Sequence, residues 1–212
     1  MADNEKDAYG RIARFYDRLL EPVNAPLRSI ASKLFPTDQT MTVLDVGCGT
    51  GAHLEAYSES GASCFGLDAS LAMLEQATAR LGDSCSLELG DAAALPYEDS
   101  IFDLVFAALF LHELDDAVRV AAMSEMARVV KAEGRVLIID YRSGSLRLKG
   151  YVTRSLSTVA ERVAGKDHYR NWRMYLRTGG IPQVAPKVGL TVEREKIVAG
   201  GNLALWLLKA GG

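Results

Sequence analysis

Short apolar runs alternate along this chain with segments whose apolar residues recur every three or four positions. The runs at 41–46, 63–68, 84–90, 102–108 and 135–141 have the length and composition of strands. Residues 50–60, 70–81 and 117–131 have the spacing of helices. Strands that alternate with helices predict an α/β fold, with a mostly parallel sheet covered by helices on both faces.

The C-terminal part of the chain departs from this alternation. Residues 190–199 and 203–210 read as two strands joined at Gly200, Gly201 and Asn202, which predicts an antiparallel hairpin and a mixed sheet of seven strands. The stretch before them is longer than one crossover requires and predicts helices at 145–165, 167–180 and 182–189. We expect one domain over 1–212, with an N-terminal helical cover at 1–36 (helices 5–20 and 25–34) and a helical lid at 142–180.

Composition narrows the class of protein. The chain has 212 residues, 49% hydrophobic and 24% charged, which is typical of one globular domain. Its net charge of −3 provides no basic field for nucleic acid. The polar start lacks a signal-peptide pattern and the longest apolar run, 104–111, is too short to cross a bilayer, so we expect a cytoplasmic protein. Three cysteines without ligand spacing predict reduced thiols and no metal site.

The sequence VLDVGCGTG at 43–51 places three glycines, Gly47, Gly49 and Gly51, between a strand and a helix. A strand, a glycine turn and a helix form a nucleotide-binding arrangement. The spacing is G-x-G-x-G rather than G-x-G-x-x-G, and no Lys-Ser/Thr pair follows. Asp45 would repel a pyrophosphate but suits a cationic group, so the pattern disfavours a nicotinamide dinucleotide.

Two more acids end neighbouring strands. Asp68 ends the second strand, where a ribose-binding acid is expected, and Asp91 follows the third. The carboxyl ends of parallel strands meet at one edge of a sheet, and that edge is the ligand crevice of open α/β folds. The sequence therefore predicts a ligand site that brings Asp45, Asp68 and Asp91 together.

Four stretches in this order resemble class I S-adenosylmethionine-dependent methyltransferases with a Rossmann-like fold: VLDVGCGTG, GLDASLAMLEQA, GDAAALPYEDSIFDLVFA and EMARVVKAEGRVLIIDY. The chain is most similar to the small-molecule branch that includes ubiquinone and menaquinone biosynthesis methyltransferases. The resemblance implies S-adenosylmethionine as cofactor, S-adenosylhomocysteine as product and a small-molecule methyl acceptor.

The resemblance also implies which residues contact the cofactor. It places Asp45 and the loop residues Gly47, Cys48, Gly49 and Gly51 around the methionine part, and Asp68 on the ribose hydroxyls. Ala69, next to Asp68, is also expected to contact the cofactor. It places Met73, Asp91 and Ala92 at the adenine, and Ala107 and Ala108 below the sulfonium. Tyr9 and Tyr16 lie in a segment that resembles the N-terminal cover of the cofactor.

The acceptor side is predicted from His112, Tyr141 and the lid residues His168, Tyr169 and Arg170. His112 or His168 could take the proton of a phenol or an acid, whereas a neutral amine would require no base. His112 could instead only pack or cap its loop, and Glu113 is expected to be solvated. Tyr169, Trp172 and Tyr175 have helical spacing and fit a core as well as a substrate wall.

Charge is distributed unevenly. Residues 142–178 contain nine lysines and arginines against two acids, which leaves +7, so the remainder of the chain carries −10. This segment could be a solvated helical face, but the asymmetry favours an anionic acceptor or contact with anionic lipid headgroups. The leading interpretation is an enzyme that methylates a small molecule. The alternative from another class is a regulatory protein that binds S-adenosylmethionine without turnover.

Overall fold

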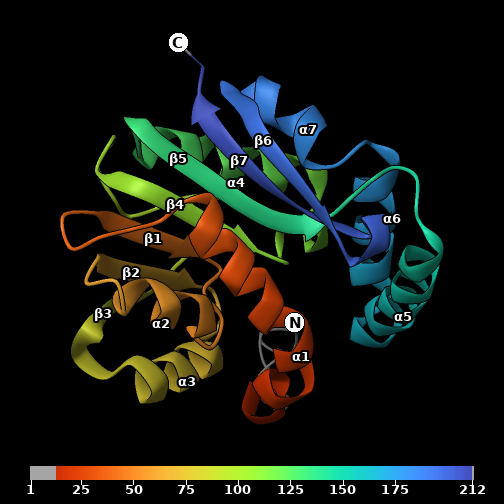
Figure 1. The fold of residues 1–212 in the computed structure, drawn as a ribbon, viewed down its shortest axis with the longest axis horizontal. Helices are drawn as coiled ribbons and strands as arrows, with labels where there is room; N and C mark the ends of the chain where they lie inside the picture. Colours follow the sequence, from red (N-terminus) through yellow and green to blue (C-terminus); the bar gives the residue numbers. More distant parts are fainter. Residues whose placement is uncertain (1–12, 212) are drawn as a thin grey trace.

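The structure, a computed structural model, describes residues 13–211, with side chains from residue 24 onward. Its strands form one mixed sheet in the order β3-β2-β1-β4-β5-β7-β6 (Figure 1). The strands are β1 (Thr42–Val46), β2 (Ser63–Asp68), β3 (Cys85–Leu89), β4 (Phe102–Ala108), β5 (Val130–Tyr141), β6 (Leu190–Val198) and β7 (Leu203–Ala210). β1 to β5 are parallel, and β7 runs antiparallel to both β5 and β6. The predicted seven-stranded, mostly parallel sheet with an antiparallel C-terminal hairpin is confirmed.

Helices cover both faces of the sheet, as predicted (Figure 1). One face carries α1 (Ala13–Leu34), α2 (Ala52–Ser58) and α3 (Leu71–Leu81), and the other carries α4 (Asp116–Val129) and the short α7 (Ile181–Val184). Because both faces are covered, the central strands read as nearly continuous apolar runs. Val43 and Leu44 of β1 and Val136 to Ile139 of β5 are fully buried.

The lid contains two helices that pack on each other, α5 (Leu148–Ala164) and α6 (Lys166–Arg177). They lie beyond the ends of β5 and β7, on the right of Figure 1. α5 also contacts the 3-10 turn Ala199–Gly201 that joins β6 to β7. The lid therefore lies at the edge of the sheet where β5 ends.

Three elements differ most from the sequence prediction. The helix expected over 182–189 is the four-residue α7 followed by the 3-10 turn Ala185–Val188. α1 is one helix that continues through Pro22 and Pro26, where a break was expected; residues 5–12 of the predicted first helix lie outside the described part. A proline removes one N–H donor, and the packing of α1 on α2 and α3 outweighs this local signal. β5 begins at Val130 rather than 135, with a shift in register opposite Phe102 and Leu104. Gly134 permits that shift, since a Cβ there would lie 2.8 Å from the Asp103 carbonyl oxygen.

Candidate functional site

A cavity of about 380 Å³ lies where the carboxyl ends of β1, β2, β3 and β4 meet. This is the edge at which the sequence predicted a ligand site. Its walls come from the glycine loop, the end of β2, the start of α3, and the loops that follow β3 and β4. The lining residues are Gly47, Gly49, Leu67, Asp68, Ala69, Ser70, Met73, Gly90, Asp91, Ala92, Ala108, Leu109, Phe110, Glu113 and Leu114.

The glycine loop folds tightly against the end of β2. The backbone N–H groups of Gly47 and Cys48 both donate to the Leu67 carbonyl oxygen, at 2.8 and 3.1 Å. Gly47, Gly49 and Gly51 have positive φ angles of 70°, 54° and 75°, which glycine adopts without steric cost. A Cβ on Gly47 would meet the Phe110 ring at 2.8 Å and one on Gly51 would meet Leu81 at 2.7 Å, whereas a Cβ on Gly49 would meet no atom within 4 Å. Gly47 and Gly51 therefore allow close packing, and Gly49 presents bare backbone to open space.

Asp68 ties this loop to the next strand. Its Oδ2 accepts from the Gly49 backbone N–H at 2.8 Å and its Oδ1 accepts from the Ser70 N–H at 2.8 Å. Burial raises the pKa of Asp68, and the backbone hydrogen bonds partly oppose that shift because they favour the carboxylate. A carboxylate has about four acceptor positions, more than its backbone donors occupy, so Asp68 can hold the loop and still accept from a ligand hydroxyl.

Asp45 is buried, and one of its two carboxylate oxygens lacks a hydrogen-bond partner among the described residues. Its side chain is 1% exposed, and the oxygen in question is Oδ1. Burial raises the pKa of Asp45 well above its usual value, and the nearby charge of Asp68 raises it further. Buried polar atoms in proteins are rarely left unpaired, so an unpaired carboxylate oxygen behind a ligand loop indicates a missing donor or cation.

The other predicted cofactor residues divide into two groups. Ala69, Met73, Asp91, Ala92 and Ala108 line the cavity together with Gly47 and Gly49. Asp45, Cys48, Gly51 and Ala107 do not line it. Asp45 and Ala107 are buried behind the cavity wall, and burial raises the pKa of the Cys48 thiol. Tyr9 lies outside the described residues, as does the side chain of Tyr16.

His112 lies in a buried hydrogen-bonded cluster beside the cavity, in the loop after β4. Its Nδ1 is 2.7 Å from Asp140 Oδ1 and its Nε2 is 3.3 Å from Glu161 Oε1. The hydroxyl of Tyr141 donates to Glu161 at 3.2 Å. Asp140 also accepts from the backbone N–H groups of His112 and Tyr141. Because Glu161 belongs to α5, this cluster joins the lid to the end of β5.

The surroundings of His112 favour its protonated form. Burial by itself lowers the pKa of His112, but the carboxylates of Asp140 and Glu161 outweigh burial and raise it to about 10. At neutral pH the ring is therefore an imidazolium between two carboxylates. In this arrangement both ring nitrogens donate hydrogen bonds, and neither is free to accept a proton.

Glu113 is the residue that sequence reasoning passed over. It was expected to be solvated, but it lines the cavity, and its side chain is 28% exposed. Its carboxylate oxygens lie 3.9 Å from His112 Nε2 and 3.8 Å from His168 Nδ1. The available signal was its position in the loop after β4, next to His112.

Arg119, on α4, fixes the loop that carries His112 and Glu113. Its side chain is 1% exposed, and its Nε donates to the Leu111 carbonyl oxygen at 2.8 Å. A second guanidinium nitrogen donates to the Leu114 carbonyl oxygen, and a third pairs with Asp116. Burying an arginine is costly unless its donors are satisfied, so these contacts hold the loop in one conformation.

The predicted lid residues do not all reach this cluster. His168 does, through Glu113, and Asn171 of α6 donates to the Glu113 carbonyl oxygen at 2.7 Å. Tyr169 instead accepts from Arg162 and Arg173, and Arg170 is 69% exposed and pairs with Asp167 at 2.9 Å. Arg170 thus lies on the outer face of α6, because the other face of this helix is occupied by the buried Trp172 and Tyr175.

In residues 13–211, no helix has the length and apolar character that a membrane crossing requires. In the same part of the chain, no cluster of three or more His, Cys, Asp or Glu side chains could hold a metal ion.

Comparison with known proteins adds to this geometry. Residues 44–138 match the family described as methyltransferase domain. A demethylmenaquinone methyltransferase from Renibacterium salmoninarum is 34% identical over 125 residues, which are 57% of this chain and 52% of that protein. The chain thus spans about half the length of the curated relatives it matches.

Solved structures extend the likeness of fold to the whole chain. The methyltransferase bound to the Trm112 activator from Haloferax volcanii has a TM-score of 0.71 and 19% identity, with 98% of both chains covered. Phosphoethanolamine N-methyltransferase 2 from Haemonchus contortus, solved with S-adenosyl-L-methionine, has a TM-score of 0.65 and 19% identity over 87% of this chain and 52% of that one. The seven-stranded sheet and its flanking helices are therefore a Rossmann-like methyltransferase fold.

Proposed function

We propose that this chain, which carries a methyltransferase domain resembling the class I S-adenosylmethionine-dependent enzymes, transfers a methyl group to a small-molecule acceptor. The observation that carries the proposal is the cavity at the strand ends, where the open backbone of Gly49 lies beside Asp68 and Asp91. A phosphate-rich dinucleotide fits this cavity poorly, because carboxylates surround the loop.

The residues present fit S-adenosylmethionine. Its ammonium and sulfonium are cationic, and Asp45 has an unpaired buried oxygen behind the loop. Its ribose hydroxyls can donate to Asp68, whose carboxylate keeps a free acceptor position, and Met73 offers an apolar contact for the adenine. When bound, S-adenosylmethionine supplies an electrophilic methyl group. The chain then has to align the acceptor and exclude water.

The acceptor is proposed to lie between the cavity and the lid, where Glu113 faces the cavity. Methylation of an O–H, N–H or C–H acceptor releases a proton, and Glu113 is the ionisable side chain best placed to take it on this side. His112 Nε2 and His168 Nδ1 flank its carboxylate oxygens at 3.9 and 3.8 Å. The base role predicted for His112 requires Glu161 to leave its Nε2, because the carboxylates otherwise keep the ring protonated.

The class of acceptor is inferred from the relatives and from the lid. The matched relatives are named demethylmenaquinone methyltransferases, which supports an aromatic acceptor of lipid-like character. The lid lies beyond residues 44–138, and its +7 charge supports an acceptor with an acidic or anionic group.

The test measures cofactor binding and turnover separately. We expect S-adenosylhomocysteine to bind in calorimetry, and we expect labelled methyl groups from S-adenosylmethionine to appear on a quinol or phenol within a panel that also contains carboxylic acids and amines. Glu113→Gln should reduce kcat by a larger factor than it weakens S-adenosylhomocysteine binding. If S-adenosylhomocysteine binds but no acceptor becomes labelled, the non-catalytic alternative is favoured. If S-adenosylhomocysteine does not bind, the cofactor assignment is refuted.

A further inference from the structure

The outer face of α5 carries a row of apolar side chains that the proposed chemistry does not use. Leu148, Val152, Leu156, Val159 and Val163, here called the apolar row, are 59% to 86% exposed. They recur every three or four residues and therefore lie on one face of the helix. Single exposed apolar residues are ordinary on a protein surface, but a contiguous row of this kind marks an interaction site.

The opposite face of α5 prevents the helix from rolling to bury this row. Gly150 lies so close to the turn after β6 that a Cβ would be 2.1 Å from the Gly200 carbonyl oxygen. Thr153 donates to the Ala199 carbonyl oxygen at 3.0 Å, and Glu161 is buried against His112. Turning the helix would break these contacts, so the structure holds the apolar row outward.

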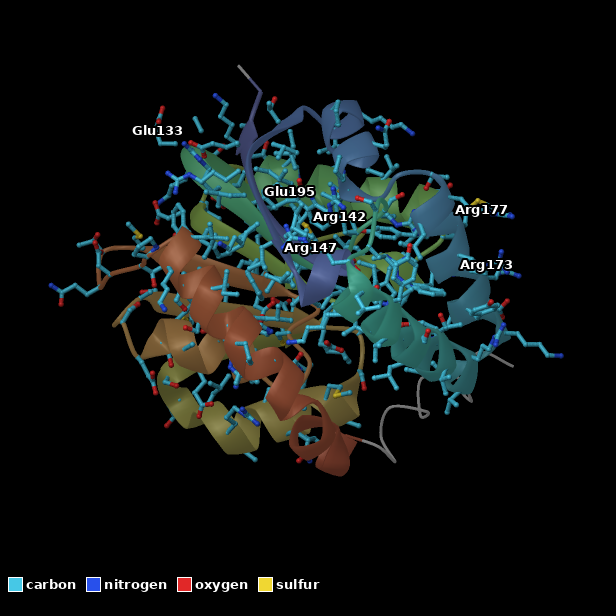
Figure 2. The ribbon with its side chains drawn as sticks, turned by 45° about the vertical axis from the view of Figure 1, so that its right-hand side comes forward. Glu133, Arg142, Arg147, Arg173, Arg177 and Glu195 are labelled. Carbon is cyan, nitrogen blue, oxygen red and sulfur yellow. The ribbon has the colours of Figure 1, made fainter. Side chains whose placement is uncertain are left out.

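Basic side chains surround the apolar row. Lys149 and Arg162 are exposed on α5, and Lys166, Arg170, Arg173 and Arg177 are exposed on α6. Figure 2 shows Arg173 and Arg177 projecting away from the body of the protein. The two helices bring their charges together, because Arg162 and Arg173 lie 4.8 and 5.7 Å from the centre of the same Tyr169 ring.

An apolar row surrounded by basic side chains favours one kind of partner over the others that could cover an apolar face. A second copy of the chain would bring two basic lids together, and their like charges would repel. An anionic bilayer satisfies both features, since acyl chains accept the apolar side chains and headgroups neutralise the arginines. We propose that α5 lies on the surface of anionic membranes, with the apolar row among the acyl chains and the basic side chains of α6 among the headgroups.

Such a contact would place the acceptor side of the site next to the bilayer, because α5 is the helix that carries Glu161 to His112. It would also apply to a protein without turnover, so the proposal does not depend on methyl transfer. The proposed contact is with the membrane surface, and none of the described helices is long and apolar enough to cross the membrane.

Sedimentation with vesicles tests the proposal. We expect the protein to bind vesicles that contain phosphatidylglycerol at least about ten-fold more strongly than pure phosphatidylcholine vesicles, and added salt to weaken that binding. The double variant Leu156→Glu, Val159→Glu should lose about ten-fold or more of the binding. Arg173→Ala with Arg177→Ala should reduce the preference for phosphatidylglycerol by a similar factor.

Leu71→Glu is the matched control. Leu71 is 60% exposed, like the apolar row, but lies on α3 beside β3 at the far end of the sheet. Its vesicle binding should stay within about two-fold of the wild type, and every variant should keep its S-adenosylhomocysteine affinity as evidence of folding. Equal binding of the wild type and the Leu156/Val159 variant would overturn the proposal. So would a wild-type dimer, seen by analytical ultracentrifugation, that this variant dissociates.

Discussion

Replacing Asp45 with asparagine should stabilise the unliganded protein and weaken its ligand. The carboxylate is 1% exposed, its Oδ1 is unpaired among the described residues, and burial raises its pKa well above 3.8. At neutral pH the folded protein must either bury the Asp45 charge or hold a proton that the unfolded chain has lost, and each unit of the raised pKa costs about 1.4 kcal/mol. Asparagine keeps the shape without an ionisable group, so we expect it to raise the free energy of unfolding by about 1 kcal/mol. For a chain of this size that corresponds to a rise in Tm of about 2–4 °C.

The same change should reduce S-adenosylmethionine affinity. A charge-assisted hydrogen bond is worth about 1.5–3 kcal/mol, so Asp45→Asn should weaken binding by about ten- to a hundred-fold. Calorimetry with S-adenosylmethionine and thermal unfolding without ligand should therefore move in opposite directions. A lower Tm together with unchanged affinity would refute the reasoning.

The effect on stability should depend on pH. A native pKa above the unfolded value means that the native state holds a proton that the unfolded state has lost. The wild type therefore loses stability as pH rises above about 3.8, until pH passes the native pKa of Asp45. The difference in the free energy of unfolding between the asparagine variant and the wild type should grow over that pH range and be absent below it.

Asp103→Asn is the matched control, because it should have the opposite sign. Asp103 accepts from Lys131 at 2.8 Å and from the backbone N–H of Thr42 at 2.8 Å. Burial tends to raise its pKa, but these donors outweigh it and lower the pKa. Removing this carboxylate should lower Tm at neutral pH and leave ligand affinity unchanged.

Three further predictions follow from particular contacts. Gly49→Ala and Gly189→Ala should each cost about 1–2 kcal/mol in unfolding experiments, because both glycines have positive φ angles (54° and 74°) and open space at Cβ. Only Gly49→Ala should weaken S-adenosylhomocysteine binding. Asp140→Asn should destabilise the protein by about 3–5 kcal/mol at neutral pH, because it leaves the His112 charge buried without its main partner. In the wild type, the stability contributed by His112 should be fully present below pH 6.5 and be lost as pH rises through about 10, as urea titrations across this range would show.

Local patterns were sufficient for most of the fold. The central strands are almost wholly apolar because both faces of the sheet are covered, so their positions were legible in the sequence. The glycine loop was equally legible, because positive φ angles at Gly47, Gly49 and Gly51 are a local requirement that few other residues meet. The break expected before residue 25 was wrong, since packing of α1 outweighed Pro22 and Pro26.

Residues that are close in the chain encode the parallel sheet, its hairpin, the ligand edge and the acids along it, so these features could be predicted without a structure. The acceptor side could not. The ionisation of His112 depends on Asp140, 28 residues away, and on Glu161 from the lid. Glu113 was expected in solvent but lines the cavity, and Arg170 was expected at the acceptor but faces solvent. Burial and charge pairing arise between segments that are distant in sequence, and no local pattern encodes which segments will meet.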